Sequence, residues 1–163
     1  MASQSRGVIQ GVSVTPTISV SAFTSGDAMH TDAIEVKNIV QQNGSGIIVG
    51  VGVADLDKVS GDFDLLFFTA DPSTSTVTAN AALDLADAEL LNLAGHVSVV
   101  AADYTAFNDN GFATKSMLVP FDKGTIDTSS ATARSLWMIL VARDNSDFTT
   151  TTALTITVYM EQD

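Results

Sequence analysis

Cysteine is absent from the 163 residues of this chain, and basic residues are scarce, with 7 lysines and arginines against 19 aspartates and glutamates. Without cysteine the chain can form neither a disulfide framework nor a thiolate metal site. This absence excludes zinc ribbons and enzymes with a cysteine nucleophile, and it leaves the redox compartment of the protein open.

The shortage of basic residues gives a formal net charge of −12. A nucleic-acid-binding protein must neutralise phosphates with lysine and arginine, and an anionic membrane surface makes the same demand. The few cations are scattered along the chain rather than clustered: Arg6, Lys37, Lys58, Lys115, Lys123, Arg134 and Arg143. We therefore expect no direct binding to nucleic acid or membrane.

Long apolar runs are also lacking. No run approaches the roughly 20 residues of a membrane-spanning helix, and the N-terminus has no sustained apolar stretch typical of a signal peptide. The sequence predicts a soluble protein without a classical export signal. No fixed-period repeat, linker or shift in composition marks a second domain, so we expect a single one.

Motifs of common enzymes and metal sites are missing. His30 and His96, the only histidines, form neither HExxH nor HxH, and no GxSxG is present. Gly44, Gly46 and Gly50 precede an expected strand rather than a helix, so they do not make a dinucleotide site. We expect no enzymatic activity, no cofactor and no metal, and we expect both histidines at the surface or at strand ends.

An acidic cluster, DLDKVSGDFD, contains Asp55, Asp57, Asp62 and Asp64. Its spacing does not fit the twelve-residue calcium loop. Asp62 and Asp64 lie too close together for the separated acid and base of a glycosidase, unless another strand supplies the partner. The sequence favours a charged hairpin loop.

The hydrophobic pattern has a period of two over most of the chain, which is typical of β-strands. We expect a break between two strands at Thr15-Pro16 and a hairpin turn at Asn43-Gly44. The expected strands include DAIEVKNIV, IIVGVGVADL, FDLLFFTA, HVSVVAAD, FATKSMLVPF, RSLWMILVAR and ALTITVYMEQ. This pattern predicts an all-β fold, an antiparallel β-sandwich or barrel.

One segment departs from this period. In ALDLADAELLNLAG the apolar residues have helical spacing, which predicts one short helix over Asp84–Leu93 that ends at Gly95. We assign residues 31–163 to the β-sandwich, and residues 1–30 to an N-terminal arm or additional strands.

The segment FDLLFF is apolar at four successive positions, Leu65 to Phe68. We expect one set of these side chains in the sandwich core, and the other set beneath the helix or a neighbouring subunit. Pro72 should stop the strand, and Asp71 should bond nearby backbone. Trp137 lies in a run that is apolar on both faces, so we expect core or subunit-interface packing rather than a sugar platform.

The segment Asp64–Tyr104 resembles a family of tailed-bacteriophage virion proteins, the capsid decoration or cement proteins. The shared features are an apolar strand ending in Asp-Pro, a threonine-rich loop, the LADAELLNLAG segment, a second strand and AADY. GSGIIVGVGVADLDK before it, GFATKSMLVPF after it and the terminal LTITVYMEQD extend the resemblance from about Ile34 onward.

The resemblance implies a jelly-roll-like β-sandwich that binds the outer surface of the phage head. The partner would be the major capsid protein, with assembly in the host cytoplasm. It also implies self-association, for which we favour a homotrimer over a dimer. An acidic protein suits the outside of the shell, because packaged DNA would repel it on the inside.

The polar N-terminal segment carries a rare cation, so we predict capsid contacts from Ser3, Gln4 and Arg6. The alternative function is a carbohydrate-binding β-sandwich module in a tail or adhesion structure, with the acidic loop binding calcium.

Overall fold

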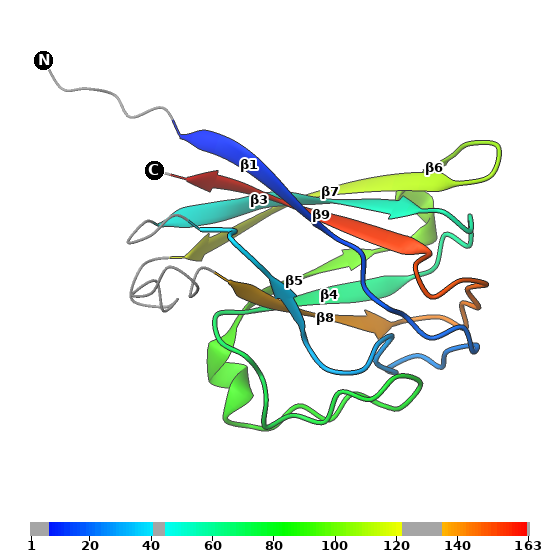
Figure 1. Cartoon of the computed structure of the whole chain (residues 1–163), viewed down its shortest axis with the longest axis horizontal. Helices are drawn as coiled ribbons and strands as arrows, with labels where there is room; N and C mark the ends of the chain where they lie inside the picture. Colours follow the sequence, from blue (N-terminus) through cyan, green and yellow to red (C-terminus); the bar gives the residue numbers. More distant parts are fainter. Residues whose placement is uncertain (1–6, 41–44, 122–134, 163) are drawn as a thin grey trace, which may run out of the picture.

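The computed structural model describes residues 7–40, 45–121 and 135–162, which form two antiparallel β-sheets packed face to face (Figure 1). The five-stranded sheet has the order β1 (Val8–Val14), β9 (Leu154–Gln162), β3 (Gly46–Asp55), β7 (Gly111–Phe121) and β6 (Tyr104–Ala106). The four-stranded sheet has the order β2 (Ile34–Val36), β8 (Leu136–Ala142), β4 (Phe63–Phe68) and β5 (Leu93–Val99).

The connections between strands are those of a jelly roll. Apart from the short β6, the chain changes sheet at each step from β1 to β4, stays in the same sheet for β5, and changes sheet again at β7, β8 and β9. The groups β1-β9-β3-β7 and β2-β8-β4-β5 therefore make the two halves of an eight-stranded jelly roll. The predicted all-β, jelly-roll-like sandwich is confirmed.

The main core lies between the sheets. In β9 every second residue from Leu154 to Met160 is fully buried, and the residues between them are partly exposed. Leu65 and Phe67 of β4 and Met138 of β8 meet them from the other sheet. The period of two in the sequence thus reports which side of each strand faces the core.

The outer side of the four-stranded sheet, called here the covered face, is buried beneath the chain itself. Leu66 and Phe68 point to this side, so FDLLFF packs on both faces, as predicted. In Figure 1 the cover is the green segment that runs below β8 from the end of β4 to β5. The residues that pack there with Leu66 and Phe68 are Ala28, Ala33, Val77, Leu83, Leu85, Leu93, Trp137, Ile139 and Val141.

The predicted helix over Asp84–Leu93 is much shorter than expected. It is a single 3-10 turn, η1 (Glu89–Asn92), and Asp84 instead exchanges backbone hydrogen bonds with Thr76. Gly95 does not end a helix but lies in β5, opposite Phe67. Leu83, Leu85 and Leu93 of this segment pack against the covered face without forming one side of a helix, whereas Leu90 and Leu91 are exposed. A second 3-10 turn, η2 (Ala101–Asp103), and β6 were not expected from the sequence.

The turn after β4 also differs from the prediction. β4 ends at Phe68, before Pro72, and the Ser75 N–H donates to the Pro72 carbonyl oxygen at 3.0 Å. The carboxylate of Asp71, expected to bond nearby backbone, makes no hydrogen bond within the described part of the chain. The backbone therefore closes this turn by itself.

Two hairpin predictions are wrong. Asn43-Gly44 lies outside the described residues, but the strands on either side, β2 and β3, belong to different sheets. The acidic loop likewise joins β3 to β4 across the sandwich. The strand expected after Thr15-Pro16 is reduced to one bridge between Ile18 and His30. A jelly roll pairs strands that are distant in sequence, so a turn signal between neighbours does not establish that they pair.

The first thirty residues contribute to both sheets in the part that is described. β1 pairs with β9, and Gly26–His30 then runs beside β8. There the Met29 N–H donates to the Leu140 carbonyl oxygen at 3.0 Å. The described helices include none long and apolar enough to cross a membrane.

The two histidines have different environments. His96 is exposed on β5, as expected, whereas His30 is buried, which corrects the prediction. The Leu140 N–H donates to His30 Nε2 at 2.9 Å, so the proton is on Nδ1, which donates to the Asp32 carbonyl oxygen at 2.7 Å. His30 is thus a structural link between the N-terminal segment and β8.

Candidate functional site

The outer side of the five-stranded sheet, called here the open face, is not covered by the described segments. It is the upper side of the molecule in Figure 1. Its side chains alternate with core residues along four strands. They are Ile9, Gly11 and Ser13 from β1; Thr155, Thr157, Tyr159 and Glu161 from β9; Ile47, Gly50, Gly52 and Ala54 from β3; and Phe112, Thr114, Ser116, Leu118 and Pro120 from β7.

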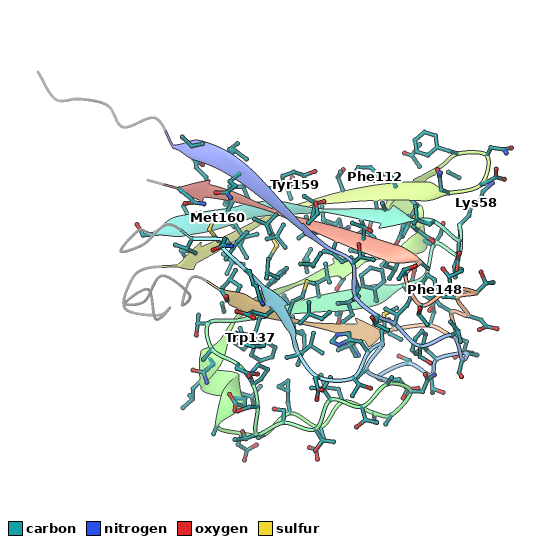
Figure 2. All side chains as sticks on the ribbon, viewed as in Figure 1. Lys58, Phe112, Trp137, Phe148, Tyr159 and Met160 are labelled. Carbon is teal, nitrogen blue, oxygen red and sulfur yellow. The ribbon has the colours of Figure 1, made fainter. Side chains whose placement is uncertain are left out.

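Glycines allow aromatic rings to lie against the middle of the open face. A Cβ atom on Gly11 would lie 3.2 Å from Tyr159 Cε1, and one on Gly52 would lie 3.2 Å from Phe112 Cζ and 3.3 Å from the Tyr159 hydroxyl. The rings therefore occupy the space that side chains at Gly11 and Gly52 would need. Figure 2 shows Tyr159 and Phe112 on this upper side of the sheet.

Hydroxyl groups pair across the strands next to these rings. Ser13 Oγ and Thr157 Oγ1 are 2.8 Å apart, and Thr15 Oγ1 and Thr155 Oγ1 are 2.9 Å apart. Short β-branched and hydroxyl side chains in such cross-strand pairs project little from the sheet and include few mobile groups. Such a surface loses little side-chain entropy when a partner covers it.

Several apolar residues of the open face lie near one end, whereas Phe112 lies toward the other. Ile9 pairs with Glu161, Glu161 pairs with Ile47, and Ile47 pairs with Pro120, so these side chains form one row across the sheet. Ile9 is 64% exposed and Leu118 is 79% exposed. A shallow depression of about 260 Å³ lies beside this row, lined by Ile9, Val49, Gly50, Val51, Thr114, Lys115, Ser116 and Tyr159.

One edge of the open face is β1, which pairs with β9 on one side only. Its sequence, VIQGVSV, contains no charged residue and no proline, the usual protection of an exposed sheet edge. The predicted capsid-contact residues Ser3, Gln4 and Arg6 precede this strand and lie outside the described residues. The open face itself could not be assembled from the sequence, because it joins strands that are far apart in the chain.

Each cation in the described part of the chain has a partner elsewhere. Lys115 Nζ is 2.8 Å from Asp103 Oδ1, and this hydrogen bond lowers the pKa of the Asp103 carboxyl. Arg143 contacts Asp64 at 2.6 Å, and Lys37 contacts Glu35 at 3.4 Å. Lys58 Nζ donates to the Asn108 carbonyl oxygen at 3.0 Å. These contacts leave no basic patch on the described surface.

The acidic cluster of the sequence holds loops together instead of forming a site. Asp55 accepts the N–H groups of Asp57 and Ser60, at 3.0 and 2.7 Å. Asp57 accepts those of Thr149 and Thr150, at 2.7 and 2.9 Å.

The other two acids of the cluster are occupied in the same way. Asp62 accepts the Ala101 N–H at 2.6 Å, and Asp64 accepts the Ser98 hydroxyl at 2.6 Å. No group of three or more acidic or histidine side chains among the described residues is arranged to hold a metal ion.

Comparisons with known proteins give no family assignment: no protein-family model matches the chain, and no curated protein matches it significantly. The chemistry of the open face and the motifs of Asp64–Tyr104 therefore carry the functional proposal.

Proposed function

We propose that the chain is a virion structural protein, a decoration or cement subunit that binds the outer surface of a tailed-phage head through its open face. The observation that carries this proposal is the distribution of charge. The chain has 19 acidic residues, yet Glu161 is the only charged side chain among the open-face residues, and Lys115, which lines the depression beside them, is paired with Asp103. The core of a protein–protein interface is depleted of charged groups in the same way.

The form of the open face supports attachment to another protein. It combines exposed apolar side chains, two aromatic rings and paired hydroxyl groups on a rigid sheet. Apolar area supplies the favourable free energy, and the rigid sheet limits the entropy that binding must remove. The acidic remainder of the surface favours the outside of the shell, away from packaged DNA.

Stabilisation of the phage head would come from many such contacts. Each subunit would bridge neighbouring copies of the major capsid protein, and repetition over the lattice would add the small contributions together. A homotrimer at local three-fold positions would strengthen attachment further, with a dimer as the alternative. The segment that contains Ser3, Gln4 and Arg6 leads into edge strand β1 and stays a predicted capsid contact.

Co-sedimentation with expanded phage heads that lack the protein tests this function. The decisive variant is Leu118→Asp, which puts a charge on the open face; Leu91→Asp is the matched control, since Leu91 is 89% exposed on η1, beside the covered face. We expect saturable binding of the unchanged protein at a fixed ratio to the capsid protein. Leu118→Asp should weaken it at least tenfold, about 1.4 kcal/mol, while Leu91→Asp leaves it unchanged.

Equal binding by both variants would show that the open face is not the attachment surface. Failure of the unchanged protein to bind heads, together with binding to cell-surface glycans or tail structures, would replace the decoration function with the carbohydrate-binding alternative. The mass of the protein in solution, measured on the same sample, separates trimer from dimer.

A further inference from the structure

A second candidate site lies on the other side of the molecule, where the cover meets the start of β8. It is a cavity of about 200 Å³, smaller than the pockets that hold drug-sized ligands and suited to one side chain. Apolar groups and polar groups both line it: Ala33, Pro72, Val77 and Trp137, with Asp32, Asp71, Ser73 and Ser75. Figure 2 shows Trp137 projecting from β8 toward the cover.

The two carboxylates of this cavity differ from the acids that hold loops together. Asp55, Asp57, Asp62 and Asp64 all accept hydrogen bonds from the protein. The side chains of Asp32 and Asp71 have no hydrogen-bond or ion-pair partner in the described part of the chain, and neither does Ser73.

Other acids surround the cavity and increase its negative potential. Burial and the charges of Glu89, Glu35 and Asp32 raise the pKa of the Asp71 carboxyl above its ordinary value. Lys37 is bound to Glu35 at 3.4 Å, and its side chain is 71% exposed. The described residues thus supply little positive charge here, so the cavity favours a cation and repels an anion.

Trp137 decides which kind of cation fits. An indole ring attracts a delocalised organic cation, and a guanidinium group can stack on a ring while it donates paired hydrogen bonds to carboxylates. A divalent metal prefers several converging oxygen ligands, and the described residues contain no group arranged to hold one.

We propose that this cavity binds a guanidinium group, the side chain of an arginine presented by a partner protein, between Trp137 and the carboxylates of Asp32 and Asp71. The arginine would neutralise two acids that have no partner among the described residues. Ser73 and Ser75 would contribute hydroxyl groups at the rim. That the arginine comes from the capsid protein rests on the proposed function. The preference for a guanidinium group is argued from this chain alone.

Trp137 is the only tryptophan of the chain, so intrinsic fluorescence reports directly on the cavity. The probe is N-acetylarginine amide, titrated at millimolar concentrations in low salt. N-acetylcitrulline amide is the matched control, because it has the same shape without the charge. We expect a saturable change in Trp137 fluorescence with the arginine compound and at least tenfold weaker binding of the citrulline compound.

Variants of the protein locate the binding. Asp71→Asn and Asp32→Asn should each weaken binding of the arginine compound at least fivefold. Asp147→Asn removes an exposed charge in the loop between β8 and β9, and should leave binding unchanged. Equal binding of the arginine and citrulline compounds, insensitivity to Asp71→Asn and Asp32→Asn, or saturation by a neutral sugar or by Ca²⁺ instead would overturn the proposal.

The same variants separate this inference from the proposed function. If Asp71→Asn lowers both arginine binding and head binding, the cavity takes part in attachment. If Asp71→Asn lowers arginine binding but leaves head binding unchanged, the cavity binds a guanidinium group, but an arginine of the capsid protein does not occupy it. Failure of the fluorescence titration alone would reject the site and leave attachment through the open face intact.

Discussion

The two sheets of this sandwich have outer sides of opposite character. On the covered face Phe68, Ile139 and Val141 are almost fully buried beneath the segment between β4 and β5. On the open face Phe112 and Leu118 are exposed, and their neighbours are mainly glycine, serine and threonine. The four-stranded sheet thus lies between the cover and the five-stranded sheet, whereas the outer side of the five-stranded sheet is exposed.

The strands of the two sheets differ in sequence for this reason. FDLLFF in β4 and LWMILVA in β8 are apolar at nearly every position, because both of their sides are buried. LTITVYMEQ in β9 alternates apolar and polar residues, because only one side is buried. The rule does not hold for every strand: β3 (GIIVGVGVAD) is also mainly apolar, yet its outer side belongs to the open face. An apolar strand sequence alone therefore does not establish that the outer side is covered.

The largest expected effect comes from shortening the same residue type on each face. Phe68→Ala should lower the free energy of unfolding by about 3–5 kcal/mol, because Phe68 is fully buried in the covered face. Phe112→Ala should cost less than about 1 kcal/mol, since Phe112 is 38% exposed. Urea unfolding of both variants measures the difference. Similar losses in the two would show that the open face is as well packed as the covered one.

A smaller effect should distinguish two glycines of the open face, one that lies against backbone and one that lies against side chains. A Cβ atom on Gly50 would lie 2.8 Å from the Lys115 carbonyl oxygen, which the sheet holds in place, so Gly50→Ala should cost about 1–3 kcal/mol. Gly52→Ala would meet only the rings of Phe112 and Tyr159, which can shift, and should change stability by less than about 1 kcal/mol. Thermal and urea unfolding test this order; the reverse order would mean that the rings are fixed.

The smallest expected effect is a pH dependence on the covered side of the molecule. Burial lowers the pKa of His30 below its ordinary value of 6.5, although Asp32 and nearby backbone groups oppose the shift. The unfolded chain therefore takes up a proton first as the pH falls. The stability that neutral His30 contributes is complete above about pH 6.5 and declines below it, by at most about 1.4 kcal/mol per pH unit.

Urea unfolding between pH 7.5 and 5.5 measures this decline. His30→Gln should remove the part of the slope that belongs to His30, and His96→Gln is the matched control because His96 is exposed. An unchanged slope in His30→Gln would assign the pH dependence to other groups.

Much of the fold was predictable from local pattern. The period of two placed the long strands, and the apolar run in FDLLFF indicated burial on both sides. The helix over Asp84–Leu93 and the hairpin turns were mispredicted because helical spacing and turn residues act locally, while this fold pairs distant strands. Leu83, Leu85 and Leu93 instead pack against the covered face without a helix, and Leu90 is exposed.

By itself, then, the sequence determined composition, charge and the sides of each strand, because these depend on residues that are neighbours in the chain. Only the tertiary structure decided which sides became surfaces. The open face joins Ile9, Ile47 and Leu118 from three strands, and the cavity joins Asp32, Asp71 and Trp137 from three separate segments. The burial of His30 was settled in the same way, by the backbone of β8. Long-range packing sets the distances between these residues, and the local sequence pattern does not reveal them.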